Sequence, residues 1–337
     1  MMQRTRSLLR STTVAFSALA ISIGLTGMVG CDKGGSGGGS AAGMIESMPA
    51  GTTAVFGMSF DKLRATKQFK ESMDKAMADA PPEYAKAKEI CGMDPIESIS
   101  SVVVAIPTDP DREKDQIIVA VSGKFEKSKV NECLPKLVKE FGKEGESINI
   151  EEEGKLTKYS SGKGDKAYLY WPNANTVVLS IGGMESESPE PLAAMIAGEK
   201  LKGKAAVMDM VGKADKGAAM WFAGAVPAQL AEGAGPMAAM VPKQGYGTLE
   251  LSKGMSLKVS LIMENADSAT GLVGLINSMG LPQLKQLPQA AQFMDVIDAI
   301  KFEAKDGMVN ITLDLTQEQL DKIAAEAEKN LMQGGGL

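Results

Sequence analysis

Serine and lysine three residues apart form the first pattern in this sequence whose spacing could do chemistry. It occurs at Ser59–Lys62, Ser72–Lys75 and Ser160–Lys163. On a helix this spacing places a lysine beside a serine nucleophile, as in acyl-serine enzymes. The companion motifs S-D-N and K-T-G are absent, and chance gives nearly as many such pairs in a chain this rich in serine and lysine. We therefore do not expect an acyl-serine enzyme.

Other routes to catalysis lack the residue types that they need. The chain contains no histidine, which excludes Ser-His-Asp and Cys-His sites and removes the usual ligands of catalytic zinc. No G-x-x-x-x-G-K-[ST] phosphate loop occurs. Asp109, Asp111 and Asp115 alternate like the start of a calcium loop, but the glycine at the sixth position is missing and Ala120 occupies the twelfth. We predict a polar hairpin loop there, and no catalytic residue, cofactor or metal.

Cys31 ends a segment that is typical of bacterial export signals. Three arginines within the first ten residues precede a short apolar stretch, 14–25, and small residues follow it. Gly30 and Cys31 resemble the lipobox of bacterial lipoproteins, although Met28 replaces the more usual leucine. Ordinary secretory cleavage beside an incidental cysteine is the alternative. We predict that residues 1–30 are a removed signal peptide and that Cys31 carries lipid, palmitate included.

A glycine- and serine-rich tether, 31–43, follows the predicted lipid site. Such a chain is a flexible coil with a reach of roughly 20 Å. Removal of the signal peptide leaves 33 basic and 42 acidic residues, a formal charge of −9. An acidic domain is a poor partner for nucleic acid or an anionic lipid surface. We expect the lipid to make the membrane contact, and we expect no nucleic-acid binding.

Cys91 and Cys133 are the two cysteines that remain. Outside the cytoplasm, leftover cysteines favour a disulfide. Cys91 ends a predicted helix with Gly92 as the residue after its C-terminus, and Cys133 belongs to the apolar stripe of another. A disulfide closing this loop would contribute about 4 kcal/mol in the chain-entropy model. Two separate buried thiols are the alternative.

Methionine is unusually frequent, with 19 of 22 in the mature chain, among them Met208, Met210, Met237 and Met240. Thioethers fill irregular cores, make adaptable surfaces for apolar ligands, and bind Cu(I). Because most of these residues lie on apolar helix faces or strands, core filling is the favoured interpretation. An apolar ligand groove and a copper site are the alternatives.

The hydrophobic pattern predicts alternating strands and helices from Met44 onward. Strands are expected over residues 53–59, 101–106, 116–122, 155–159, 167–171, 176–181, 218–225, 246–251, 256–263, 300–304 and 308–315. Helices are expected from 60 to Pro81, over 83–91, around Cys133, over 189–197 and over 227–240. A further helix is expected with Leu272, Val273, Ile276 and Met279 on one apolar face, and the last helix begins after a capping box at Thr316–Gln319.

Several local signals refine this pattern. Pro135 is expected to kink or restart the helix around Cys133, and Asp306-Gly307 is a strong hairpin turn. The glutamates at 151–153 beside the lysines at 155–166 predict a solvated loop or an edge strand. In both halves the predicted elements follow in the order strand, helix, hairpin, helix, hairpin, helix. We infer an α+β fold of two similar modules of antiparallel sheet packed with helices, over 44–198 and 199–337.

The segments MPAGTTAVFGMSFDKL and CGMDPIESISSVVVAI, with the lipobox and glycine-rich start, resemble exported lipoproteins of myxobacteria and related groups. The resemblance covers most of the mature chain and implies a repeated exported α+β domain. No activity is known for that group, so the resemblance implies no functional residues.

The sequence therefore predicts a lipoprotein of the cell envelope, anchored by lipid on the periplasmic side or at the cell surface. We expect it to act without catalysis, through binding or structural contacts with an envelope protein partner. A carrier that holds a lipid or other apolar ligand in a methionine-lined groove is the alternative, and an enzyme comes third.

Overall fold

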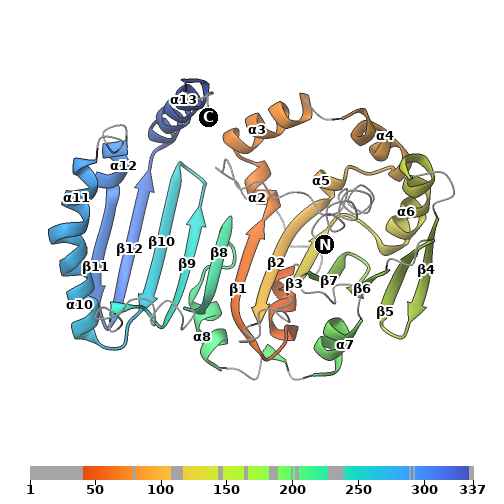
Figure 1. Ribbon diagram of the computed structural model, residues 1–337, viewed down its shortest axis with the longest axis horizontal. Helices are drawn as coiled ribbons and strands as arrows, with labels where there is room; N and C mark the ends of the chain where they lie inside the picture. The colour runs from red at the N-terminus through yellow and green to blue at the C-terminus, as the bar shows by residue number, and fades with distance from the viewer. Residues whose placement is uncertain are drawn as a thin grey trace, which may run out of the picture. The chain divides into compact units, whose positions relative to one another are not determined.

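The computed structural model describes residues 41–78, 81–107, 117–142, 147–162, 166–181, 189–198, 200–201, 205–226, 238, 240–287, 290 and 293–333 (Figure 1). The described chain forms two compact units. Unit 1 comprises residues 41–52 and 71–201, and unit 2 comprises 53–70 and 205–333. Each unit packs helices on an antiparallel sheet, so the predicted α+β class is confirmed.

Six strands of unit 1 pair in the order β2-β3-β7-β6-β5-β4. Their bounds are β2 Ile99–Pro107, β3 Ile117–Gly123, β4 Ile148–Glu153, β5 Leu156–Ser161, β6 Lys166–Asn173 and β7 Thr176–Ile181. The hairpin predicted from the β-branched runs is confirmed by the pairing of β2 with β3. β4 lies at the edge of this order and carries the three glutamates, which agrees with the edge-strand interpretation.

The helices of unit 1 cover this sheet and build its core. They are η2 Ala41–Ser47, the greater part of α3 Lys67–Ala78, α4 Pro82–Cys91, α5 Pro95–Ser98, α6 Lys127–Phe141 and α7 Glu190–Ala197. η2 takes up the last three residues of the predicted tether. The α6 stripe packs Val130 against Tyr159 and Leu169 of the sheet. α6 does not restart at Pro135, which lies inside a single helix.

Six strands of unit 2 pair in the order β11-β12-β10-β9-β8-β1. Their bounds are β1 Thr52–Ser59, β8 Met220–Ala225, β9 Gln244–Glu250, β10 Met255–Ile262, β11 Ile300–Lys305 and β12 Met308–Leu315. Residues 53–70 belong to this unit, whereas the sequence-based division placed them in the first module. The reason is the pairing of β1 with β8, in which Gly57 leaves room for the Trp221 ring: a Cβ there would lie 2.1 Å from it.

The helices of unit 2 are α2 Phe60–Arg64, α8 Ala205–Lys213, α10 Ala266–Leu275, the π-helix η5 Ile276–Gly280, α11 Leu281–Gln286, α12 Met294–Ala299 and α13 Gln317–Gln333. The predicted capping box is confirmed, because the Thr316 N–H donates to Gln319 Oε1 and the Gln319 N–H donates to Thr316 Oγ1. Asp306 and Gly307 both have positive φ in the β11–β12 turn, as the sequence predicts. α8 was not predicted, and most of the helix expected over 227–240 lies outside the described residues.

Both units contain the same arrangement of two hairpins and a helical connection. In unit 1 the strands β2, β3, β6 and β7 lie in the order β2-β3-β7-β6. In unit 2 the strands β9, β10, β11 and β12 lie in the order β9-β10-β12-β11. α6 follows the first hairpin in unit 1, and α10, η5 and α11 follow it in unit 2 (Figure 1). These four strands and their helical connection therefore share one topology in the two units, whereas β4 and β5 of unit 1 have no counterpart among the described residues between α11 and β11.

Candidate functional site

The predicted disulfide is present and joins two helices of unit 1. Cys91 ends α4 and Cys133 lies in α6, with their Cα atoms 4.9 Å apart. Gly92 follows α4 with a φ of 61°, the left-handed conformation expected of a glycine after a helix. Cys133 is buried. Cys31, the predicted lipid site, lies outside the described residues, as do Asp109, Asp111 and Asp115.

Asp94 organises the polar groups beside this disulfide. Its carboxylate accepts hydrogen bonds from the N–H groups of Ile96 and Glu97 and so caps α5. It also accepts one from Tyr84 Oη at 2.6 Å and pairs with Lys88 Nζ at 2.6 Å. Burial acts to raise the pKa of Asp94, but these hydrogen bonds outweigh burial and hold the pKa below its ordinary value. The cluster satisfies its members internally and has a structural role.

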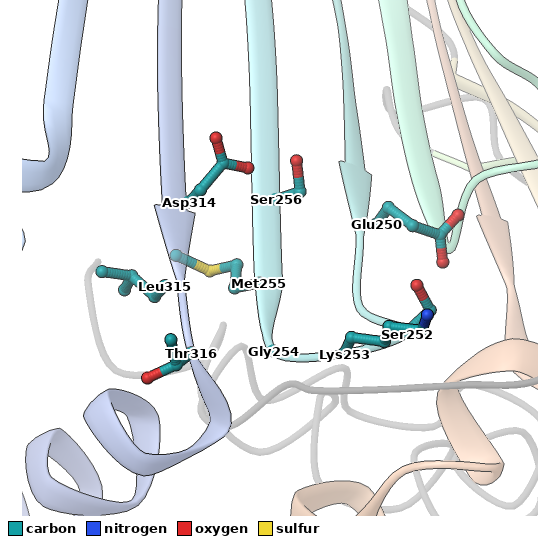
Figure 2. A pocket seen from close by; sticks show the side chains of 9 residues that line it. All are labelled: Glu250, Ser252, Lys253, Gly254, Met255, Ser256, Asp314, Leu315 and Thr316. Carbon is teal, nitrogen blue, oxygen red and sulfur yellow. The ribbon is translucent and has the colours of Figure 1, made fainter.

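An open pocket of about 300 Å³ lies in unit 2 where β9, β10 and β12 meet their turns (Figure 2). The strand register places Ser256 beside both Glu250 and Asp314. Two interstrand steps separate the carboxylate-bearing strands, which is about 10 Å, too far for the two acids to share a proton. Glu250 pairs with Lys62 Nζ at 2.8 Å and also accepts the Leu251 N–H. The pocket contains the polar groups of a binding site without a poised acid–base pair.

The structure describes both members of two of the three serine–lysine pairs. Ser59 Oγ caps α2 by accepting the Lys62 backbone N–H at 3.4 Å, while the Lys62 ammonium group binds Glu250. Ser72 and Lys75 are exposed on α3. Lys163 lies outside the described residues, so the third pair stays untested.

The methionines singled out in the sequence do not line the pocket, whose one methionine is Met255. Met210 is buried on α8, as core filling predicts, while Met208 and Met240 are partly exposed. Met237 lies outside the described residues. The pocket of unit 2 is therefore not the methionine-lined groove that the carrier hypothesis needs.

A surface that the sequence did not predict lies on η5 and α11. Met279 and Leu287 are each 51% exposed and Leu284 is 40% exposed. The periodicity placed Met279 on the same buried face as Leu272, which the structure contradicts. The Leu281 N–H donates to the Ile276 carbonyl, five residues back. One extra residue in this turn rotates the side chains that follow it by about 100°, so residues from Leu281 onward do not continue the apolar face of α10.

Within the residues that the structure describes, no group of three or more His, Cys, Asp or Glu gathers where it could hold a metal ion. In that same part of the chain, no helix is both long enough and apolar enough to cross a membrane.

Comparison with known proteins gives one distant structural match. No family model matches the chain, and no curated protein matches it. A solved structure of the Treponema protein TP0453, in crystal form I, aligns with a TM-score of 0.37 and 11% identity over 82% of this chain and 96% of that chain. Similarity this low carries no argument about function, and the resemblance to myxobacterial lipoproteins stays an expectation.

Proposed function

We propose that the protein is a lipid-anchored lipoprotein of the cell envelope that acts without catalysis, through contacts made by an exposed apolar surface of unit 2. The observation that carries this proposal is the exposure of Met279, Leu284 and Leu287 on consecutive turns of η5 and α11. Clustered apolar side chains in contact with water are costly unless a partner covers them.

Location outside the cytoplasm is supported by two independent features. Gly30-Cys31 closes an export signal, and Cys91–Cys133 is a disulfide, a bond that persists in oxidising compartments. We propose attachment on the periplasmic side of a membrane or at the cell surface.

A non-catalytic role is supported by the interactions of the candidate chemical groups. Ser59 caps a helix and Glu250 pairs with Lys62. The pKa of Lys200 is lowered by burial and by nearby Lys155, yet its ammonium group donates to the Met195 carbonyl in the last turn of α7. A lysine there stabilises a helix C-terminus, which gives it a structural role. A carrier remains the second candidate, because the pocket of unit 2, about 300 Å³ in volume, reaches the lower end of the range for small-ligand sites.

The anchor is tested by replacing its acceptor. Cys31→Ser should abolish metabolic labelling with palmitate and move the protein from the detergent phase to the aqueous phase in phase separation. The Cys91→Ser/Cys133→Ser variant is the matched control, because it also replaces cysteines but leaves Cys31, and it should keep the label. Equal labelling of wild type and Cys31→Ser would contradict the proposal.

The mode of action is tested on protein purified from its own membrane. Native mass spectrometry should show the chain without a tightly bound small molecule. A lipid or other apolar ligand that stays bound at stoichiometric amounts would instead support the carrier.

A further inference from the structure

The exposed apolar surface lies in a part of unit 2 almost without charge. Asp267 and Asp295 enclose 27 residues, of which one, Lys285, is charged. Lys285 Nζ pairs with Asp298, so even this charge has its counter-ion. In a chain with 23% charged residues, an exposed helical stretch of this composition is unusual. Charged residues are depleted in the part of an interface that loses its contact with water when a partner binds.

The same stretch has the geometry of a protruding apolar ridge. α10, η5 and α11 run end to end from Ala266 to Gln286 beside β11 (Figure 1). α10 packs Ala269, Leu272 and Val273 into the core of unit 2, whereas almost every residue from 277 to 287 is exposed. Apart from Lys285, which pairs with Asp298, the exposed polar side chains there are amides and a hydroxyl, among them Asn277, Ser278 and Gln283. These uncharged groups tolerate both water and lipid headgroups.

The tether keeps a bilayer within reach of the folded chain. Nine residues separate Cys31 from Ala41, the first described residue, and a fully extended chain spans at most about 3.5 Å per residue. Ala41, where the described part of unit 1 begins, therefore stays within about 35 Å of the lipid-bearing residue. The formal charge of −9 after signal removal repels most of the surface from anionic headgroups. A stretch of the sequence without carboxylates can approach lipid at a lower electrostatic cost than an acidic one.

We infer that residues 276–287 contact the bilayer surface directly, with Met279, Leu284 and Leu287 entering the boundary between headgroups and acyl chains. The inference rests on the proposed function and names the partner of its apolar surface as lipid. Apolar helix faces lie about 5–10 Å deep in this boundary, a depth that side chains on one or two helical turns can reach. The contact adds a second, weaker attachment to the one made by the acyl chains, and it fixes how unit 2 faces the membrane.

The test uses protein that begins at residue 31 with Cys31→Ser, made without lipid, so that acylation plays no part. Flotation with phosphatidylcholine vesicles, with and without phosphatidylglycerol, measures binding. The unsubstituted chain should float with phosphatidylcholine vesicles and less with anionic ones. Met279→Glu/Leu284→Glu/Leu287→Glu should weaken the partition by at least about tenfold, because each change removes apolar contact and adds a repelled charge.

A matched pair of single variants separates this surface from general hydrophobicity. Leu287→Glu and Ile181→Glu each place one carboxylate at a large apolar residue, of 51% and 47% exposure. Leu287→Glu should reduce flotation and Ile181→Glu should not, while circular dichroism shows both folded. Failure of the unsubstituted chain to float, or equal effects of the two variants, would overturn the inference. Self-association that the triple variant abolishes, without vesicle binding, would assign the surface to a second copy and also overturn it. Palmitate labelling of Cys31 is independent of all these outcomes.

Discussion

α6 and the α10–η5–α11 segment occupy the same place in the topology of their units, because each follows the first hairpin. They differ in the charge of the side chains that they present to water. Six of the fifteen residues of α6 are charged. Some of them form ion pairs with neighbouring elements, among them Lys127–Glu152 and Lys86–Glu140. The segment in unit 2 has no charged residue from Ser268 to Leu284.

The two helices also differ in how they are held. α6 is covalently joined to α4 by Cys91–Cys133, and the Asp94 cluster lies beside the junction. In unit 2, α10 begins at the Asn265 cap and packs on the sheet, but η5 and α11 extend beyond that packing. One topology therefore supports two kinds of surface: α6 presents charged, ion-paired side chains to water, whereas η5 and α11 expose apolar side chains, which we propose contact a partner.

The largest effect is expected from removing the disulfide. Cys91→Ser/Cys133→Ser should lower the free energy of unfolding of unit 1 by about 4 kcal/mol, because the bond closes a loop of 42 residues. Urea denaturation followed by circular dichroism measures the change. Vesicle binding should not change, since the bond lies outside unit 2. A loss of vesicle binding that parallels the loss of stability would contradict the claim that the disulfide stabilises unit 1 without affecting the apolar surface of unit 2.

Acid should weaken the Asp94 cluster in a defined direction. The folded-state pKa of Asp94 is lowered, so its contribution to stability is present above its unfolded value, about pH 4, and is lost as pH falls through the folded value. Asp94→Asn keeps a capping oxygen but should lower the free energy of unfolding by about 1–2 kcal/mol near neutral pH. It should also reduce the fall in stability that wild type shows as pH falls. Asp267→Asn, a first-turn control in α10, should change stability by less than about 0.5 kcal/mol. Parallel acid profiles for wild type and Asp94→Asn would contradict the assignment.

Much of the local structure could be predicted from the sequence, because short-range chemistry determines it. The Thr316–Gln319 capping box, the Asp306-Gly307 turn and the Gly92 helix end each depend on a few adjacent residues, and all three are confirmed. The disulfide followed from the compartment and from two helical patterns.

The remaining features depend on contacts that periodicity does not encode. β1 pairs with β8 across more than 150 residues of chain, and its alternation specifies two faces but no partner. The apolar stripe leaves the core at the π-helical turn η5, which contains Met279 and in which the Leu281 N–H donates to the Ile276 carbonyl; the residue types do not reveal this turn. The signal that could have revealed the apolar surface was the charge-free stretch between Asp267 and Asp295.

A smaller effect is expected from the cap of α10. Asn265 Oδ1 accepts the Ser268 N–H at 2.8 Å, and Asn265→Ala should cost about 1 kcal/mol of stability in unit 2. Thermal unfolding measures it, with Asn265→Asp as the control that keeps the cap and should stay near wild type. An equal loss in both variants would mean that the cap does not hold this helix.

Hydrogen exchange on the lipid-free chain, with and without phosphatidylcholine vesicles, tests the contrast between the two helices most directly. The account predicts that vesicles slow amide exchange in residues 276–287 by about tenfold while residues 127–141 of α6 exchange as before, because lipid excludes water from one helix and not the other. Unchanged exchange in residues 276–287, or equal slowing in both helices, would contradict it.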